Sequence, residues 1–417
     1  MDRYGLICRS IYEDSDVTQR ELSSILGISL GSVNKLVGEC LKDGLIQNHS
    51  EYGKYSLTEK GMEYLEQYRV DGAVITAAGF GSRFVPLSFE TPKGLLEVFG
   101  ERMIERQIRQ LHEAGITNIT LIVGYLKEKF EYLIDKYNVK LFYNPEYTCK
   151  STLATVYQGR ELFYGKNMYL LVSDNWIRNN MFHTYECGSW YSSVYMEGDT
   201  SEWCVTANKK GKISSITIGG HDSWTLYGPA FLSKDFTETF FPLLESDYHR
   251  PGTEQCYWEH VLLNYIDKLD FYVNCQPEHQ VYEFENLEEL RLFDPKYRNH
   301  SDNEAMRLVS QVFHVKESAI RNIRCLKAGM TNKSFLFEVN NKHYICRIPG
   351  PGTELLINRK EEEASYHAVE PLDITEHIIY FDGDNGYKIA KYYEGSRNAE
   401  CSGTGPRYSA GSARRWI

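Results

Sequence analysis

The sequence has no apolar run that approaches the ~20 residues needed to span a bilayer, and Met1-Asp2-Arg3 does not lead into the core of a signal peptide. The ten cysteines are scattered, with no Cys-x-x-Cys pair and no close cluster of cysteine with histidine. These absences argue against a membrane protein, a disulfide scaffold and a zinc site. We therefore expect a cytosolic protein with reduced thiols and no membrane contact.

The sequence also has fewer basic than acidic residues. The 417 residues include 46 lysines and arginines against 57 acidic residues, which leaves a net charge of −11 at pH 7. This balance argues against broad adhesion to nucleic acid or anionic lipid, because phosphate backbones attract basic surfaces. The charges sum to −3 over residues 1–70, −9 over 71–300 and +1 over 301–417. The acid excess therefore lies in the middle of a chain long enough for about two to four domains.

Residues 1–70 have the order of elements of a small helical domain with a wing. Apolar periodicity predicts helices over about residues 4–12 and 29–41. Between them, Thr18 and Glu21 form the pattern of a capping box, and Gly27 lies in the following turn. Residues 52–57 are expected to form a two-stranded wing. This order resembles the winged helix-turn-helix of bacterial regulators.

The resemblance suggests a role for the third helix of this domain. It would place four polar side chains in a DNA major groove, those of Ser29, Ser32, Asn34 and Lys35. Glu39 and Asp43 weaken the attraction of the same helix to phosphate. The sequence thus leaves two alternatives for residues 1–70, a DNA-binding domain or a structural or dimerising module.

A different pattern begins at Asp71. Residues 72–78 form a short apolar run of buried-strand type that breaks into a glycine-rich turn, and a helix near residues 103–114 and a strand near 118–125 follow. This order predicts a parallel α/β sheet that binds ligands at the carboxyl ends of its strands.

The glycine-rich turn suits a nucleotide triphosphate. Gly79 and Gly81 permit positive φ and close approach of backbone N–H groups, while Arg83 offers a forked cation and Lys93 a point charge. The turn is neither a Walker loop nor a Gly-x-Gly-x-x-Gly motif.

The string from Ala77 to Phe84, with Thr91-Pro-Lys-Gly-Leu-Leu after it, resembles the signature of the nucleotidylyltransferase superfamily that activates sugar phosphates and phosphocholine. Further matches extend to about residue 295. The resemblance implies a Rossmann-like α/β core with a mostly parallel sheet. It also implies that Arg83 and Lys93 are catalytic, and that the nucleotide is bound by Ala77, Ala78, Gly79, Gly81, Ser82, Tyr125 and Ser151.

Asp174 falls on the family's metal-binding aspartate, which holds Mg²⁺ on the α-phosphate. The chemistry needs such a residue, because an anionic phosphate attacks another anionic phosphate and the charges must be neutralised. The alternative is a carboxylate that merely caps the following turn.

Two further segments, Thr200-Ser-Glu-Trp-Cys and Glu254-Gln-Cys-Tyr-Trp-Glu-His, resemble the bacterial CTP:phosphocholine cytidylyltransferases. The resemblance places Trp203, Tyr257 and Trp258 around the trimethylammonium group of choline. Aromatic faces suit this cation because it has no N–H to donate. Glu259 would be either a second metal ligand or the counter-charge of the aromatic box, and it stands where the family usually has aspartate.

Residues 299–400 resemble the small lobe of choline and ethanolamine kinases. The loop from Gly329 to Ser334 would cover ATP phosphates, Arg347 would replace the usual strand lysine, and Glu361, Glu362 or Glu363 would be its partner. No His-x-Asp catalytic loop follows. We therefore expect no kinase activity from this chain, and we expect residues 401–417 to be disordered.

Together these patterns predict a winged helix at residues 1–70, a nucleotidylyltransferase at 71–298 and a partial α+β kinase-like lobe at 299–400. The predicted reaction is Mg²⁺-dependent: CTP and phosphocholine give CDP-choline and pyrophosphate, for choline decoration of cell-surface polymers. Phosphoethanolamine, 2-aminoethylphosphonate or a sugar phosphate are alternative acceptors. A nucleotide-sensing DNA-binding regulator is an alternative of another class, and a homodimer is left open.

Overall fold

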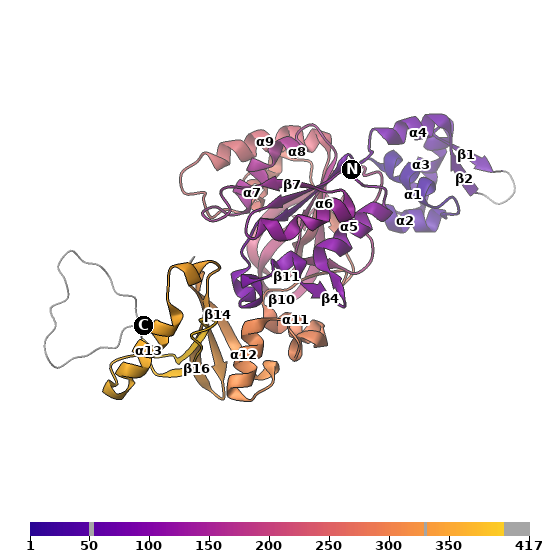
Figure 1. The fold of residues 1–417 in the computed structure, drawn as a ribbon. Helices are drawn as coiled ribbons and strands as arrows, with labels where there is room; N and C mark the ends of the chain where they lie inside the picture. The colour runs from indigo at the N-terminus through magenta and orange to yellow at the C-terminus, as the bar shows by residue number, and fades with distance from the viewer. Residues whose placement is uncertain (50–53, 329–331, 396–417) are drawn as a thin grey trace. The chain divides into compact units, whose positions relative to one another are not determined.

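The computed structural model describes residues 1–49, 54–328 and 332–395, and it divides into two compact units (Figure 1). The first unit comprises Met1–Gly79 and Gly94–Glu283, and the second comprises Phe80–Lys93 and Phe284–Ile417. The start of the predicted ATP-phosphate loop, the tip of the predicted wing and the tail predicted to be disordered lie outside the described residues. No helix in the described ranges has the length and apolar character needed to cross a membrane.

The N-terminal part of the first unit is a winged helix-turn-helix, as predicted, although the first strand of its wing lies at Ile46–His49, before the predicted range 52–57. Its elements are α1 (Arg3–Glu13), α2 (Gln19–Leu26), α3 (Leu30–Lys42), β1 (Ile46–His49), β2 (Lys54–Leu57) and α4 (Glu59–Glu66). The capping box is present, because the Thr18 hydroxyl accepts from the Glu21 N–H and the Glu21 carboxylate accepts from the Thr18 N–H. Gly27 ends α2 with a φ of +61°, a left-handed conformation that favours glycine.

The winged helix packs directly on the rest of its unit. Tyr185, from the segment between β9 (Asn175–Ile177) and β10 (Trp190–Ala207), is buried in the hydrophobic core of the winged helix. Arg9 of α1 donates to Glu186 over 2.8 Å, and the hydroxyl of Tyr169 donates to the other oxygen of Glu186 over 2.6 Å. A buried ion pair therefore links α1 to the central sheet.

The rest of the first unit is built on a seven-stranded mixed sheet of order β12-β10-β11-β8-β3-β6-β7. The strands β8, β3, β6 and β7 are parallel to one another, whereas β11 runs antiparallel to both β8 and β10. The strands are β3 (Gly72–Ala77), β6 (Ile119–Val123), β7 (Lys140–Tyr143), β8 (Met168–Val172), β10 (Trp190–Ala207), β11 (Ile213–Leu232) and β12 (Tyr272–Cys275). The predicted Rossmann-like sheet is thus confirmed.

Helices cover both faces of this sheet (Figure 1). Successive side chains of β3 point to opposite faces, so Val74 joins one core and Ala73 and Ile75 join the other. The first core contains α7 (Thr152–Gln158), α8 (Arg160–Phe163), α9 (Lys234–Tyr248) and α10 (Glu259–Tyr265). The second contains α5 (Met103–Glu113) and α6 (Tyr132–Tyr137). Short strands form two further ladders, β4 (Glu97–Val98) with β5 (Glu101–Arg102), and β9 (Asn175–Ile177) with β13 (Val281–Glu283).

The second unit contains a five-stranded antiparallel sheet of order β14-β15-β16-β18-β17. Its elements are α11 (Leu287–Phe293), α12 (Glu304–Phe313), β14 (Arg321–Ala328), β15 (Asn332–Val339), β16 (Lys342–Pro349), α13 (Arg359–Val369), β17 (Ile378–Phe381) and β18 (Lys388–Lys391). Arg347 of β16 forms an ion pair with Glu362 of α13, one of its three predicted partners. The kinase-like interpretation of this lobe stays a prediction.

The segment 80–93 packs within the second unit. The Lys333 ammonium donates to the backbone carbonyl of Phe89 over 2.7 Å, and the rings of Phe89 and Phe335 lie 6.5 Å apart. The loop that carries Arg83 and Lys93 is therefore held by β15.

Candidate active site

The strand β3 delivers the predicted nucleotide loop at its carboxyl end. The carbonyl of Ala78, one residue beyond the strand, accepts from the N–H of Tyr125, which follows the neighbouring parallel strand β6. A Cβ on Gly124 would lie 2.8 Å from the same carbonyl and 2.6 Å from the ring of Tyr147, so this close approach requires glycine. Ala77, Ala78 and Tyr125 are thereby brought together, as the order of the sheet predicts.

The two glycines of the loop differ. Gly81 has a φ of +66°, a conformation that side chains rarely adopt. Gly79 does not have a positive φ, and a Cβ placed on it would meet no atom within 4 Å. Gly81 therefore allows the positive φ of the turn, whereas the backbone at Gly79 has space beside it for a bound group. Gly81 and Ser82 belong to the second unit, and Gly79 ends a segment of the first.

Arg83 and Lys93 share one environment in the second unit. Arg83 forms an ion pair with Glu285, and the Lys93 ammonium lies 4.9 Å from the centre of the Phe84 ring. Burial raises the pKa of the nearby Glu289 carboxyl, and the positive charges of Lys93 and Arg83 oppose that rise. Two cations and two carboxyl groups thus lie within electrostatic reach of one another.

Asp174 occupies the turn between β8 and β9, and a buried glutamine holds that turn. The Gln107 amide of α5 donates to the carbonyls of Val172 and Asn175, over 2.9 and 2.7 Å. A Cβ on Gly94 would lie 2.6 Å from the Ser173 side chain, which explains the glycine after Lys93. The half-buried Asp174 is therefore carried by a turn with little freedom to move.

The described part of the chain contains no group of three or more His, Cys, Asp or Glu side chains able to hold a metal ion. Mg²⁺ is commonly bound by one or two carboxylates together with substrate phosphates rather than by a cage of protein ligands. The single carboxylate of Asp174 fits a site of this kind, in which substrate phosphates supply further ligands. Asp174 lies on the turn after β8, the strand next to β3.

Three rings from two elements meet beside the start of α10. The rings of Trp203 on β10 and Tyr257 have centroids 6.5 Å apart at 86°, and His260 lies 4.8 Å from Trp203 at 83°. Tyr257 remains 48% exposed. We call these three residues the aromatic corner. Trp203 and His260 are half-buried.

Trp258 lies apart from this corner. It is only 4% exposed, and its ring stacks on Tyr191 at 5.4 Å and packs against Phe240 at 5.8 Å. The structure thus places one of the three predicted choline-binding residues in the hydrophobic core, where it supports the loop that carries Tyr257.

Glu259 is half-buried at the first turn of α10. Its carboxyl accepts from the Tyr191 hydroxyl over 2.9 Å. Burial raises the pKa of Glu259 to about 7, the hydrogen bond from Tyr191 opposes the rise, and the charge of Glu283 adds to it. Burial, together with the charge of Glu259, also raises the pKa of Tyr191 well above its usual value. The carboxyl group of Glu283 therefore lies within electrostatic reach of Glu259.

Ser151 is tied to the same region through the backbone. Its N–H donates to the carbonyl of Glu254 over 2.9 Å, and the hydroxyl of Thr152 accepts from the N–H of Trp258 over 3.2 Å. The start of α7, predicted to contact the nucleotide, is thereby joined to the segment that carries Tyr257 and Glu259.

Comparison with known proteins agrees with this geometry. A family model described as nucleotidyl transferase matches residues 72–186, and one described as winged helix-turn-helix DNA-binding matches residues 6–47. The choline-phosphate cytidylyltransferase of Streptococcus pneumoniae (strain ATCC BAA-255 / R6) is 32% identical over 229 residues, which are 55% of this chain and 99% of that protein. The chain belongs to the cytidylyltransferases of the nucleotidyl transferase family.

Another relative is named for a different acceptor. The 2-aminoethylphosphonate cytidylyltransferase of Lancefieldella rimae is 33% identical over 227 residues, or 54% of this chain and 92% of that protein. The solved structure of the CTP:phosphocholine cytidylyltransferase from Streptococcus pneumoniae superposes with a TM-score of 0.52 at 33% identity, covering 54% of this chain and 97% of that one. The predicted nucleotidyltransferase fold and enzyme class are confirmed.

Sequence reasoning assigned no role to Gln107, Glu283 or His260 of this cytidylyltransferase. His260 is the last residue of the segment Glu254–His260, so the sequence indicated that it lies near Tyr257 but not that its ring packs against Trp203. Glu283 reaches the site because β13 pairs with β9, with Glu283 opposite Asn175. No local motif marks either Glu283 or Gln107.

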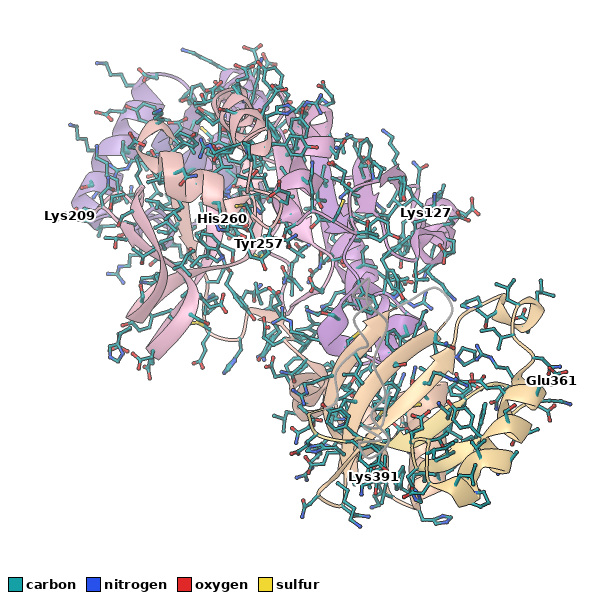
Figure 2. All side chains as sticks on the ribbon, turned by 90° about the vertical axis from the view of Figure 1, so that its left-hand side faces the viewer. Lys127, Lys209, Tyr257, His260, Glu361 and Lys391 are labelled. Carbon is teal, nitrogen blue, oxygen red and sulfur yellow. The ribbon has the colours of Figure 1, made fainter. Side chains whose placement is uncertain are left out.

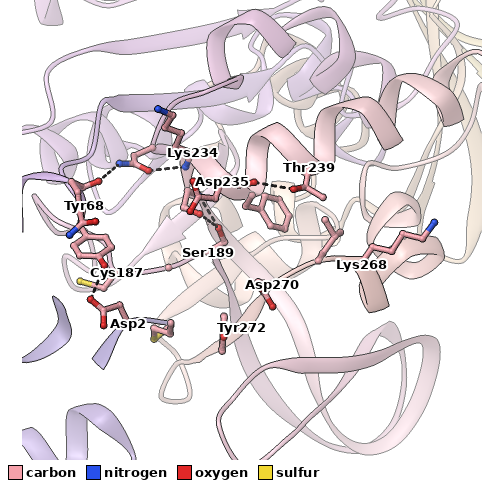
Figure 3. Close-up of a pocket in the computed structure, with 17 residues that line it drawn as sticks. Asp2, Tyr68, Cys187, Ser189, Lys234, Asp235, Thr239, Lys268, Asp270 and Tyr272 are labelled. Carbon is pink, nitrogen blue, oxygen red and sulfur yellow. Dashed lines mark hydrogen bonds between the residues drawn. The ribbon is translucent and has the colours of Figure 1, made fainter. Parts of the chain in front are cut away.

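A cavity elsewhere in the first unit holds none of these residues. It measures about 610 Å³ and lies between the start of the winged helix and the sheet, beside Asp2, Tyr68, Cys187, Lys234 and Asp270 (Figure 3). Asp2 there accepts from the Tyr68 hydroxyl over 2.7 Å. None of the predicted catalytic or binding residues lines this cavity.

Proposed function

We propose that this cytidylyltransferase forms CDP-choline and pyrophosphate from CTP and phosphocholine. A phosphate oxygen of phosphocholine attacks the α-phosphorus of CTP, and the bond from that phosphorus to the departing pyrophosphate breaks. The observation that carries the proposal is the aromatic corner, at the start of the helix whose first turn carries the Glu259 carboxyl group. Ring faces and negative charge together suit a quaternary ammonium, which offers no N–H to a hydrogen-bond acceptor.

The nucleotide end of the site is assigned on the loop and the neighbouring strand ends. Ala77, Ala78, Gly79, Gly81, Ser82, Tyr125 and Ser151 would seat CTP, and Arg83 and Lys93 would neutralise phosphate charge. Mg²⁺ would lower the charge repulsion between the two phosphates, with Asp174 as its protein ligand. Glu259, when ionised, would balance positive charge at the acceptor end.

The acceptor is tested by supplying purified full-length protein with CTP, Mg²⁺ and one acceptor at a time, and measuring pyrophosphate. The panel is phosphocholine, phosphoethanolamine, 2-aminoethylphosphonate and glucose 1-phosphate. We expect the highest kcat/KM with phosphocholine. Equal or higher kcat/KM with any other acceptor would overturn the choline assignment, and the winning acceptor would name the alternative.

The winged helix supports a second role, binding of duplex DNA. The side chains of Ser32, Asn34 and Lys35 on α3, and that of its N-cap Ser29, are exposed. Lys35 lies 3.9 Å from Glu39. A mobility shift of DNA from upstream of its own gene, with and without CTP, tests this role. Asn34→Ala should abolish a specific shift, and a shift that survives the substitution would contradict readout through α3.

The remaining assignments are proposals of the same kind. We place the enzyme in the cytosol, because the nine cysteines in the described part of the chain are free thiols.

We also assign residues 1–70, 71–298 and 299–400 to three domains. Light scattering would show whether the protein forms a homodimer. We expect no transfer of phosphate from ATP to choline, and detection of phosphocholine after incubation with both would contradict this.

A further inference from the structure

His260 is the third ring of the aromatic corner. Its ring lies 5.9 Å from that of Tyr257 at 21°, nearly parallel, while Trp203 stands close to perpendicular to both. Figure 2 shows Tyr257 and His260 beside each other at the start of α10. A group seated against Trp203 and Tyr257 therefore also meets the imidazole.

The backbone determines which nitrogen of His260 carries the proton. The N–H of Tyr257 donates to Nδ1 over 2.9 Å. An N–H on Nδ1 would face the N–H of Tyr257, so the neutral ring must carry its proton on Nε2. The carbonyl of Tyr257, 3.2 Å from Nδ1, does not alter this, because the peptide N–H can only donate. The neutral His260 ring therefore has an N–H donor at Nε2 and no free nitrogen acceptor.

We propose that His260 is a specificity-determining residue that favours a quaternary ammonium over a primary ammonium in the acceptor. The inference rests on the proposed function and names the feature by which the same site selects its substrate. His260 would then be the third ring in contact with the acceptor, in place of Trp258, which is buried in the core.

The selection follows from hydrogen-bond chemistry. A primary ammonium brings three N–H donors and loses their hydration when it is buried, so it needs acceptors. The Nε2–H of the neutral His260 ring offers such donors no acceptor, and one oxygen of the Glu259 carboxyl already accepts from Tyr191. A trimethylammonium brings no donors, and its methyl groups contact ring faces without any unmade hydrogen bond.

The test compares phosphocholine with phosphoethanolamine, which differ only in the methyl groups on nitrogen. His260→Asp replaces the ring by a carboxylate that accepts from an ammonium and retains an acceptor for the Tyr257 N–H. We expect it to shift the ratio of kcat/KM values toward phosphoethanolamine by about tenfold or more, because an acceptor then meets the donors. His260→Phe, which keeps a ring and offers no acceptor, should leave the ratio within about threefold of wild type.

The shift should lie in the KM for the acceptor, and the KM for CTP should not change. His221→Asp places the same charge at an exposed position on β11 and serves as the matched control. An unchanged ratio in His260→Asp, with phosphocholine still used by the wild type, overturns the role of His260 and leaves the proposed function intact. A wild type that does not use phosphocholine overturns both.

Discussion

At the scale of single residues, the carboxyl of Glu259 couples stability to pH. Its pKa in the folded protein is raised from 4.5 to about 7, mainly by burial. The folded state therefore binds more protons than the unfolded state between these values, and the unfolding free energy falls as pH rises through them.

Glu259→Gln keeps an acceptor for the Tyr191 hydroxyl and cannot ionise. In metal-free protein, we expect this variant to lose the fall in unfolding free energy between pH 4.5 and 7, and to exceed wild type at pH 8 by on the order of 1 kcal/mol. Urea denaturation at several pH values measures it. Glu254→Gln, at an exposed position, should follow the wild type. A pH dependence equal to that of wild type in Glu259→Gln would contradict the raised pKa.

The two tryptophans of the acceptor segments should respond oppositely to truncation. Trp258→Ala removes a buried ring that stacks on Tyr191, and we expect a loss of about 3–5 kcal/mol of stability. Trp203→Ala removes a half-buried ring of the corner, and we expect the KM for phosphocholine to rise about threefold to tenfold with a smaller loss of stability than Trp258→Ala causes. Denaturant unfolding and steady-state kinetics separate the two effects. If Trp258→Ala raised the KM for phosphocholine without lowering stability, Trp258 would have to contact the substrate.

At the scale of elements, α5 positions the turn that carries Asp174. Gln107 and Gln110 are both buried on this helix, but Gln107 holds the carbonyls on either side of Asp174 and Gln110 holds the carbonyl of Ile177. The two residues form a matched pair, since each loses a similar buried amide on substitution by leucine.

We expect Gln107→Leu to lower kcat by about tenfold or more, because a small displacement of a ligand in the reacting centre is costly. Gln110→Leu should lower stability by about 1–3 kcal/mol, as Gln107→Leu also should, and leave kcat near that of wild type. Pyrophosphate release at saturating substrates measures the difference. Equal kcat values for the two variants would show that the turn does not depend on Gln107.

The segment before α11 contacts the loop that carries Arg83 and Lys93, the two cations proposed to bind phosphate. Glu285 pairs with Arg83 where both side chains are substantially exposed, so the pair contributes little to stability. We expect Glu285→Gln to free Arg83 for phosphate and lower the KM for CTP about twofold to threefold. Glu278→Gln removes the same charge from an exposed turn and should change nothing. A higher KM for CTP in Glu285→Gln would show that Glu285 orients Arg83 rather than competing for it.

Local signals account for what the sequence alone could predict. The capping box at Thr18, the apolar run of β3 and the glycine with positive φ at position 81 act through neighbouring residues, and all are present. The burial of Trp258 and the approach of Glu283 to Glu259 depend on packing between residues far apart in the chain. Composition and spacing carry no signal for either, so a pattern that placed three rings around choline could not tell a core ring from an exposed one.

At the scale of the molecule, the winged helix and the transferase of the first unit share buried structure. Arg9 and Glu186 form an ion pair in which the side chains are 12% and 3% exposed. Substituting one partner leaves the other charge buried and unpaired.

We therefore expect Arg9→Met to lower the unfolding free energy by about 3–5 kcal/mol. Arg20→Met removes the same charge from the surface of the same domain and should stay within about 0.5 kcal/mol of wild type. Urea denaturation followed by tryptophan fluorescence measures both, since five of the six tryptophans lie in the transferase segment, residues 71–298. Equal stability of the two variants would show that the winged helix is not anchored through Arg9.

The central claim, cytidylyl transfer from CTP to phosphocholine at the site of Asp174, is tested most directly by identifying the product. Mass spectrometry of a reaction containing the full-length protein, Mg²⁺, CTP and phosphocholine should show CDP-choline in amounts equal to the pyrophosphate released, and Asp174→Asn should lose this product by about a hundredfold or more. Absence of CDP-choline with the wild type, or undiminished formation with Asp174→Asn, would contradict the account.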